Sequence, residues 1–99
     1  MPIFLDLLEH EDPEKRYFAV FQIGELALRG VELAPRILEE LLGRSKDSTA
    51  DIRAQLAHAL GKLTTSDRSR PEVAKTLERL LGDPAPRVCE EAERSIAKQ

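Results

Sequence analysis

The sequence predicts an all-α protein, a short α-solenoid of antiparallel helical hairpins with about six helices. The main observation is an internal repeat, because a pattern of arginine, glycine and leucine recurs along the chain. The segments around these residues carry apolar side chains at the spacing of an amphipathic helix. Composition agrees, since 41% of the residues are hydrophobic but only 4% are aromatic, which suits packed helices better than a β-sandwich.

The repeat is clearest between the segments that begin at Arg16 and Arg53. In both, a glycine (Gly24 and Gly61) stands eight residues after the arginine, and a leucine follows two residues later. A third and weaker copy follows, in which Cys89 takes the position of the arginine. Glycine inside a helix costs about 1 kcal/mol relative to alanine, so we expect both glycines to mark the close approach of a neighbouring helix.

Start and stop signals divide the chain into helices. Asp12-Pro13 and Asp83-Pro84 each place a capping carboxylate before a proline at the first helical position. Gly30, Gly43 and Gly82 stand where a helix would end. The expected helices cover residues 2–10, 13–29, 33–43, 49–64, 70–82 and 84–98. The second of them is apolar nearly all round, and we expect it to be buried on several sides.

This pattern resembles a HEAT repeat of the short bacterial type, the kind also found in phycobilisome-lyase-like proteins. The first copy departs from it at Lys15, where an aliphatic residue is usual, and the third lacks both the arginine and the glycine. The resemblance covers nearly the whole chain and is carried by Asp12-Pro13 with Arg16 to Leu26, Ile52-Arg53 to Leu63, and Asp83-Pro84 with Val88 to Ala97.

The resemblance implies an outer, convex layer made of the helices over 13–29, 49–64 and 84–98, and an inner, concave layer made of those over 33–43 and 70–82. The opening helix would be an inner-type helix that caps the stack. The expected single domain, 1–99, divides into a capping helix (1–11), a first repeat (12–46), a second repeat (47–82) and a half repeat or C-terminal cap (83–99). A finished protein, a fragment of a longer array and one half of a dimer all remain open.

In this fold type the repeated arginine pairs with an acidic residue of its own or the next repeat. For Arg16 and Arg53 the available partners are Asp12, Asp47 and Asp83. We therefore expect a structural ladder of ion pairs along the stack.

The candidate partner-binding surface is the polar face of the two inner helices. With the aliphatic residues turned inward, Ala74 and Leu81 among them, the outward side chains are Arg36, Glu39, Glu40, Glu72, Lys75, Thr76 and Arg79. A shift of 36 residues sets Arg36 beside Glu72 and Glu39 beside Lys75. The same residues can therefore form an internal lattice of exposed ion pairs, each worth roughly 0–1 kcal/mol, or a mixed-charge surface for a protein partner.

The segment between the fourth and fifth expected helices, residues 64–70, is polar and locally basic, and it is long for a helix connection. Long loops often carry function, so Lys62, Arg68 and Arg70 are further binding candidates. A solvated linker is the other interpretation.

Catalytic and metal-binding patterns are missing from the sequence. His10 and His58 lie in different expected helices, without the spacing of metal ligands. We therefore expect a non-catalytic scaffold or adaptor that binds another protein and needs no cofactor or metal. The alternative implied by the resemblance is a subunit or chaperone of a phycobilisome-lyase-type, chromophore-handling enzyme.

Charge and hydropathy argue against a nucleic-acid-binding protein and against a membrane-spanning one. The net charge of −3 argues against nucleic-acid binding, and no segment has the length of a membrane span. With a single cysteine and no basic leader before the first apolar stretch, the expected location is the cytoplasm. Self-association is expected either through the C-terminal helix or through the apolar residues of the first helix, which are Ile3, Phe4, Leu7 and Leu8.

Overall fold

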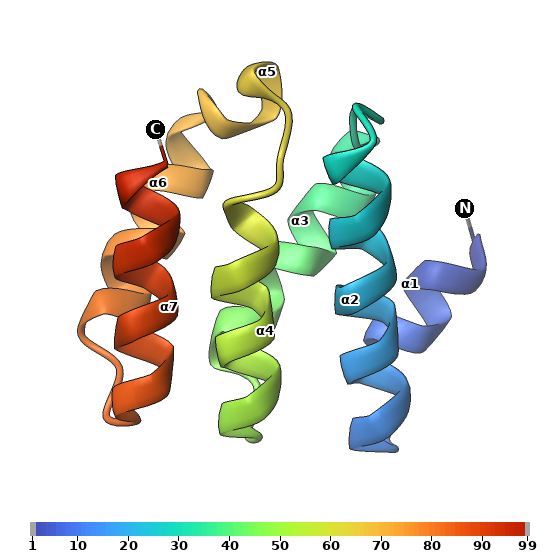
Figure 1. Cartoon of the computed structure of the whole chain (residues 1–99). Helices are drawn as coiled ribbons and strands as arrows, with labels where there is room; N and C mark the ends of the chain where they lie inside the picture. Colours follow the sequence, from blue (N-terminus) through green and yellow to red (C-terminus); the bar gives the residue numbers. More distant parts are fainter. Residues whose placement is uncertain (1, 99) are drawn as a thin grey trace.

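The computed structural model describes residues 2–98 and consists of two layers of helices. Met1 and Gln99, which belong to the predicted domain span, lie outside the described residues. In Figure 1 the outer layer stands in front and the inner layer behind it, as expected. The outer helices are α2 (Pro13–Leu28), α4 (Ala50–Leu60) and α7 (Pro86–Ala97), and the inner helices are α1 (Pro2–Leu8), α3 (Pro35–Gly43) and α6 (Pro71–Leu81). A 3₁₀ turn, η1 (Arg44–Lys46), precedes α4, and a single-turn helix, α5 (Thr65–Arg68), precedes α6.

The core lies between the two layers and is centred on α4. This helix packs between α2 and α7, and its residues Ile52, Leu56, Ala59 and Leu60 are almost fully buried. The inner helices contribute leucines from the other side, such as Leu77 in α6. A fully buried aliphatic side chain of this size contributes about 1.5–3 kcal/mol relative to an exposed one, so most of the stability comes from this shared interior.

Proline marks the first turn of most helices, but two predicted starts are two residues too early, and one of them is that of α3, which begins at Pro35 rather than at residue 33. The carboxylate of Asp12 caps α2 by accepting a hydrogen bond from the backbone N–H of Glu14 at 2.9 Å. The last helix begins at Pro86 rather than at Pro84, because the residue before a proline is held in an extended conformation. Asp83 therefore stands in the turn before α7, where its carboxylate accepts from the backbone N–H of Ala85 at 2.9 Å.

Gly24 and Gly61 are points of close helix approach, as predicted. A Cβ added to Gly24 would lie 3.1 Å from the Cβ of Ala59 in α4. A Cβ added to Gly61 would lie 2.7 Å from the hydroxyl oxygen of Ser95 in α7. The second glycine also ends its helix, so α4 stops at Leu60, earlier than predicted.

The segment between α4 and α6 is held in place by hydrogen bonds to the rest of the chain. Its interpretation as a solvated linker is therefore wrong. Thr64 caps α5 by accepting from the backbone N–H of Asp67 at 3.2 Å. The carboxylate of Asp67 is buried and accepts from the backbone N–H of Leu33 at 2.9 Å. Because Leu33 belongs to the connection between α2 and α3, this hydrogen bond joins two successive hairpin connections. The signal in the sequence is Thr64-x-x-Asp67, a helix-start pattern.

The expectation that the second helix is buried on several sides is also wrong. α2 packs against α4 and α1, and its remaining face is open. The exposed fractions are 41% for Tyr17, 50% for Phe18, 38% for Phe21 and 62% for Leu28. The structure thus leaves a strip of large apolar side chains on the outer surface.

Candidate functional site

A cleft of about 480 Å³ lies on the inner layer between α3 and α6. Leu38 and Leu42 of α3 are among the residues that line it and give it an apolar floor. The charged residues that line it come from α3, η1 and α6 and from the residue before α6, and they are Glu39, Lys46, Arg70, Glu72 and Arg79. We take this cleft as the candidate site, because it combines a concave apolar surface with charges that can fix orientation.

Four of the seven predicted inner-face residues line the cleft. Three of them, Glu72, Thr76 and Arg79, follow the spacing of one helix face on α6. The fourth, Glu39, faces them from α3. Lys75 is exposed but is not among the lining residues, since its position on α6 turns it away from this face.

Arg36 and Glu40 also lie outside the cleft, on the other side of α3. The guanidinium Nε of Arg36 is 3.6 Å from a carboxylate oxygen of Glu40. A hydrogen bond with Glu40, together with the Glu40 charge, raises the pKa of the exposed Glu9 carboxyl above its ordinary value. These residues therefore form a separate charged cluster near the end of α1.

The predicted ion-pair lattice across the inner face is wrong. Within residues 2–98, no salt bridge within 4.0 Å joins Arg36 to Glu72 or Glu39 to Lys75. The cause is helix rotation, because Glu39 and Glu72 face the cleft whereas Arg36 and Lys75 do not. Glu39 and Glu72, on the rim of the cleft, therefore lack the partners that the 36-residue shift predicts for them.

Side-chain directions on α6 need three further corrections. Thr76 is buried rather than outward-facing, and its hydroxyl donates to the backbone carbonyl of Glu72 at 2.7 Å. Ala74 and Leu81 are exposed, not inward. The buried stripe runs through Val73, Thr76, Leu77 and Leu80, so three of the expected residues are buried and Thr76 takes the place of Ala74 and Leu81.

The three basic candidates of the connection before α6 point to three different places. Arg70 lines the cleft, and its Nε lies 3.5 Å from the carboxylate of Asp67. Lys62 lies on the outer layer and forms an ion pair with Glu25 at 2.7 Å. Arg68 donates to the backbone carbonyl of Lys98 at 3.3 Å. Only Arg70 therefore belongs to the candidate site.

The rim of the cleft carries mixed charge, and Arg70 on it is already paired with Asp67. Lys46, Arg70 and Arg79 face two carboxylates, Glu39 and Glu72. Arg79 is only weakly engaged within the chain, with its Nη1 3.5 Å from the hydroxyl oxygen of the buried Ser45. The guanidinium of Arg79 can therefore form charge-assisted hydrogen bonds with an acidic group of a ligand.

The predicted ladder of ion pairs is confirmed, and it joins each repeat to the next one. Arg16 pairs with Asp47 at 2.9 Å and Arg53 pairs with Asp83 at 2.8 Å. A second nitrogen of Arg53 donates to the backbone carbonyl of Asp47 at 2.7 Å. Cys89, at the arginine position of the last copy, keeps only the equivalent backbone contact, with its thiol 3.0 Å from the carbonyl of Asp83.

The ladder lowers the pKa of both of its carboxyl groups. Burial alone raises the pKa of Asp47, but hydrogen bonds from Arg16 and from the backbone N–H of Thr49 outweigh burial and hold it below its ordinary value. The pKa of Asp83 is likewise raised by burial and lowered more strongly by its hydrogen bonds, from Arg53 and from a backbone N–H. The ionised forms are therefore the ones that the fold stabilises.

Stability should fall in acid as this ladder is protonated. A carboxyl whose pKa is lower in the folded than in the unfolded chain stabilises the fold above its unfolded value, about 3.9 for Asp, and loses this contribution as pH falls through the folded value. Urea unfolding at about pH 7, 5 and 3 should show that most of the loss in the free energy of unfolding occurs between about pH 5 and pH 3. The variant Asp47→Asn should show a smaller loss over that interval, and an unchanged loss would contradict the assignment.

The predicted self-association surface on the first helix is largely unavailable. Leu8 is fully buried, and Phe4 and Leu7 are partly buried against the core. Ile3 alone among the four predicted residues is strongly exposed. On the C-terminal helix, the only large exposed aliphatic side chain is Ile96.

Two further features concern the described residues as a whole. Between residues 2 and 98, no group of three or more His, Cys, Asp or Glu side chains is placed to hold a metal ion. None of the helices in that range is long and apolar enough to cross a membrane.

Comparison with known proteins assigns the family. No curated protein sequence matches the chain significantly. The family profile described as HEAT repeats matches residues 1–97. The two-layer stack, with its helical hairpins joined by a repeated arginine–aspartate pair, agrees with that match. The chain therefore belongs to the HEAT-repeat family.

Proposed function

We propose that the protein is a non-catalytic interaction module that binds a segment of another protein in the cleft between α3 and α6. The observation that carries this proposal is the combination of an apolar floor with a rim that holds three basic and two acidic side chains. HEAT repeats commonly act as protein-interaction scaffolds, and a stack of repeats presents a continuous surface to a partner.

The chemistry of the cleft indicates what kind of segment it would hold. Leu38 and Leu42 offer contact to an apolar side chain, and the volume of about 480 Å³ is sufficient for one. Arg79 and Lys46 can each bind a carboxylate next to it, whereas Arg70 already pairs with Asp67. The expected ligand is a short segment with an apolar anchor flanked by acidic residues.

Charge reversal in the cleft should abolish selection of such segments. In a peptide-display selection, the chain should enrich sequences with an apolar anchor beside Asp or Glu. The variant Arg79→Glu should bind these peptides at least about tenfold more weakly, since one charge-assisted contact and its reversal together exceed 1.4 kcal/mol.

The matched control is Glu78→Lys. Glu78 is exposed on the same helix but does not line the cleft. Its reversal should leave peptide binding unchanged. Equal losses in both variants, or enrichment of peptides with no acidic residue, would contradict the proposed site.

The chromophore-handling alternative stays a prediction from the resemblance to phycobilisome-lyase-like repeats. Titration with an open-chain tetrapyrrole tests it, because binding would change the visible absorption of the pigment. A spectrum that does not change would dismiss the alternative without affecting the cleft proposal.

A further inference from the structure

The outer face of α2 differs from the outer faces of the other two outer helices. Tyr17, Phe21 and Leu28 share one face of α2, Phe18 lies about 100° further round the helix than Tyr17, and all four are exposed. The positions of Phe18 and Phe21 carry polar or charged side chains in the other helices: Gln55 and His58 in α4, Glu91 and Arg94 in α7. The repeat fold therefore does not need aromatic residues there, and their exposure on α2 has to be explained by contact with something else.

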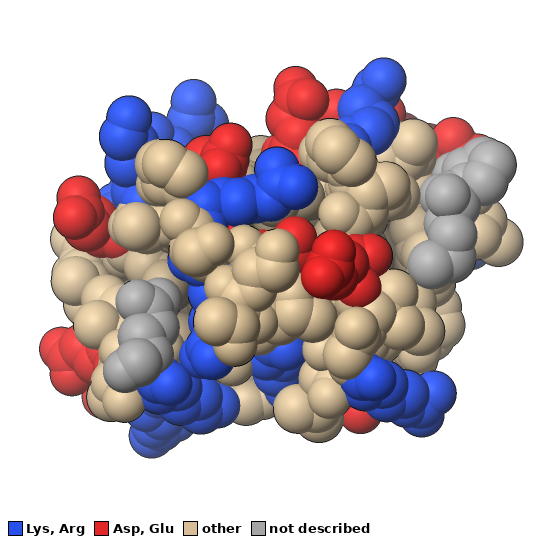
Figure 2. Space-filling model, turned by 90° about the horizontal axis from the view of Figure 1, so that it is seen from above, with Lys and Arg blue, Asp and Glu red and all other residues tan. Residues whose placement is uncertain are grey.

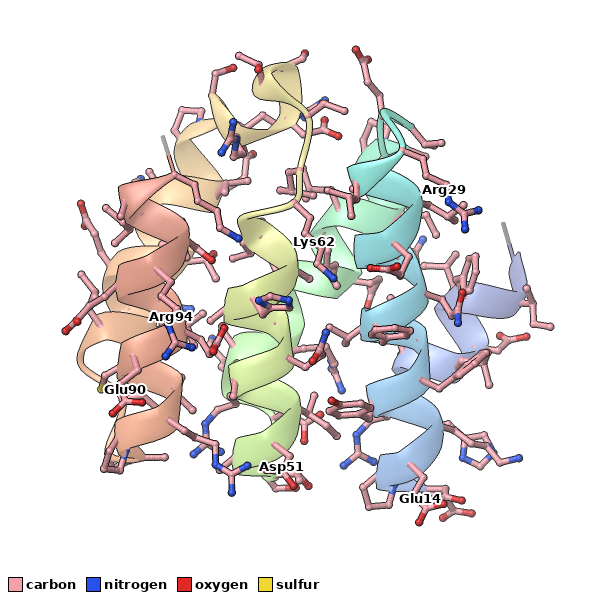
Figure 3. All side chains as sticks on the ribbon, in the orientation of Figure 1. Glu14, Arg29, Asp51, Lys62, Glu90 and Arg94 are labelled. Carbon is pink, nitrogen blue, oxygen red and sulfur yellow. The ribbon has the colours of Figure 1, made fainter. Side chains whose placement is uncertain are left out.

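The charges around this strip are arranged along the helix. In Figure 3, Glu14 lies at one end of α2 and Arg29 at the other, and Asp51 and Lys62 repeat the same order on α4. Figure 2, which views the end where the outer helices finish, shows Lys and Arg side chains gathered along the edge of the outer layer. On α4 these charges are already paired, Asp51 with Arg87 and Lys62 with Glu25. The polarity that remains is that of α2 alone, which carries Glu14 near its start and Arg29 just after its end.

Two copies of this charge pattern are complementary when they run in opposite directions. A second copy placed against α2 in the antiparallel direction, on a twofold axis between Phe21 and Gln22, brings Glu14 of each copy to Arg29 of the other. Between these two opposite-charge pairs, Phe21 of each copy lies beside the axis, at the level of Gln22 of the other copy, and Phe18 lies at the level of Glu25. A twofold interface of this kind uses the same patch on both partners.

The one carboxylate inside the strip is already neutralised. Glu25 forms its ion pair with Lys62 at 2.7 Å, and a hydrogen bond from that ammonium, reinforced by its charge, lowers the pKa of the Glu25 carboxyl. The same ammonium lies 5.5 Å from the ring centroid of Phe21. The strip thus presents no unpaired carboxylate of its own to an apolar partner, which removes the main cost of covering it.

We propose that the protein forms a twofold dimer through the outer face of α2, with α2 of one copy antiparallel to α2 of the other. The four apolar side chains of the strip expose on the order of 400 Å² in each copy, about half of the roughly 800 Å² per partner that a standard interface buries. With the polar residues around them, this area fits a weak, concentration-dependent dimer. The cleft lies on the inner layer, so the dimer is independent of the peptide-binding proposal.

Sedimentation equilibrium of the full chain tests the dimer. Over about 10 to 500 µM, the range in which small interfaces dissociate, the average mass should rise from one copy toward two. Phe18→Ser should raise the dissociation constant at least about tenfold, and Arg94→Ser, on the outer face of α7, should not change it. A wild-type monomer at the highest concentration would overturn the proposal, as would a dimer that tolerates Phe18→Ser.

A charge swap tests the antiparallel register. Glu14→Lys alone and Arg29→Glu alone should each weaken the dimer, because each places like charges at both ends of the interface. An equimolar mixture of the two variants should dimerise much more strongly than either variant alone, since both ends of the mixed dimer then carry opposite charges. Circular dichroism should show all of these chains folded, because both residues are exposed. A mixture no better than the single variants would overturn this arrangement.

Discussion

Replacing Asp47 with alanine is expected to lower the free energy of unfolding by about 3 kcal/mol, the cost of removing one partner from a buried, charged hydrogen-bond network. The Asp47 side chain is only 1% exposed. It binds Arg16 at 2.9 Å and Arg44 at 3.3 Å, and it accepts from the backbone N–H of Thr49 at 2.9 Å. The substitution would leave two largely buried guanidinium groups and one backbone donor without this partner.

Asp51→Ala is the matched control for this experiment. Asp51 also pairs with an arginine, Arg87, but both side chains are more than half exposed. An exposed pair contributes roughly 0–1 kcal/mol, so urea unfolding of Asp51→Ala should stay close to wild type. Similar losses in the two variants would show that the ladder has no special part in holding successive repeats together.

Replacing Gly61 with valine is the second large effect, and it should cost about 3 kcal/mol, the upper end for overpacking a tight contact. A Cβ at this position would stand 2.7 Å from the hydroxyl oxygen of Ser95 and 3.3 Å from its Cα. The backbone Cα cannot move without shifting α7. The two helices would have to separate, which would weaken the core around Val88 and Ala92.

Gly43→Ala provides the comparison for the glycine substitution. A Cβ on Gly43 would meet nothing within 4 Å, and its φ of −59° suits any residue. Alanine there should leave the melting temperature unchanged or raise it slightly, because it reduces the freedom of the unfolded chain. If Gly61→Val melted at the wild-type temperature, the close packing of α4 on α7 would not be limiting for stability.

The layers and the ladder could be predicted from the sequence because both depend on spacing along the chain. Arg16 and Arg53 recur at one register of the repeat, so each reaches an equivalent aspartate in the next unit. Gly24 and Gly61 mark close contacts for the same reason. Features that recur at the repeat period are set by local geometry, and local geometry can be read from a single sequence.

The cleft was predicted only in part, because a small rotation of a helix decides which side chains enter it. On α3, Glu39 faces the cleft while its neighbour Glu40 faces away. On α6 the centre of the buried stripe was predicted correctly, but Thr76 lies at its edge in place of Ala74 and Leu81. Similarly, the sequence shows that α2 is apolar but not which of its faces has a neighbour, so the exposure of Phe18 could not be foreseen.

The hydrogen bond between Asp67 and Leu33 has a consequence for how the cleft meets a ligand. Leu33 stands two residues before α3 and Asp67 four residues before α6, so this contact fastens together the starts of the two helices that wall the cleft. The carboxylate is buried, and water competes poorly for it. The spacing of the walls is therefore set when the chain folds. When a segment binds in the cleft, only the segment loses conformational entropy. The walls of the cleft are already ordered, so binding does not include the cost of ordering them.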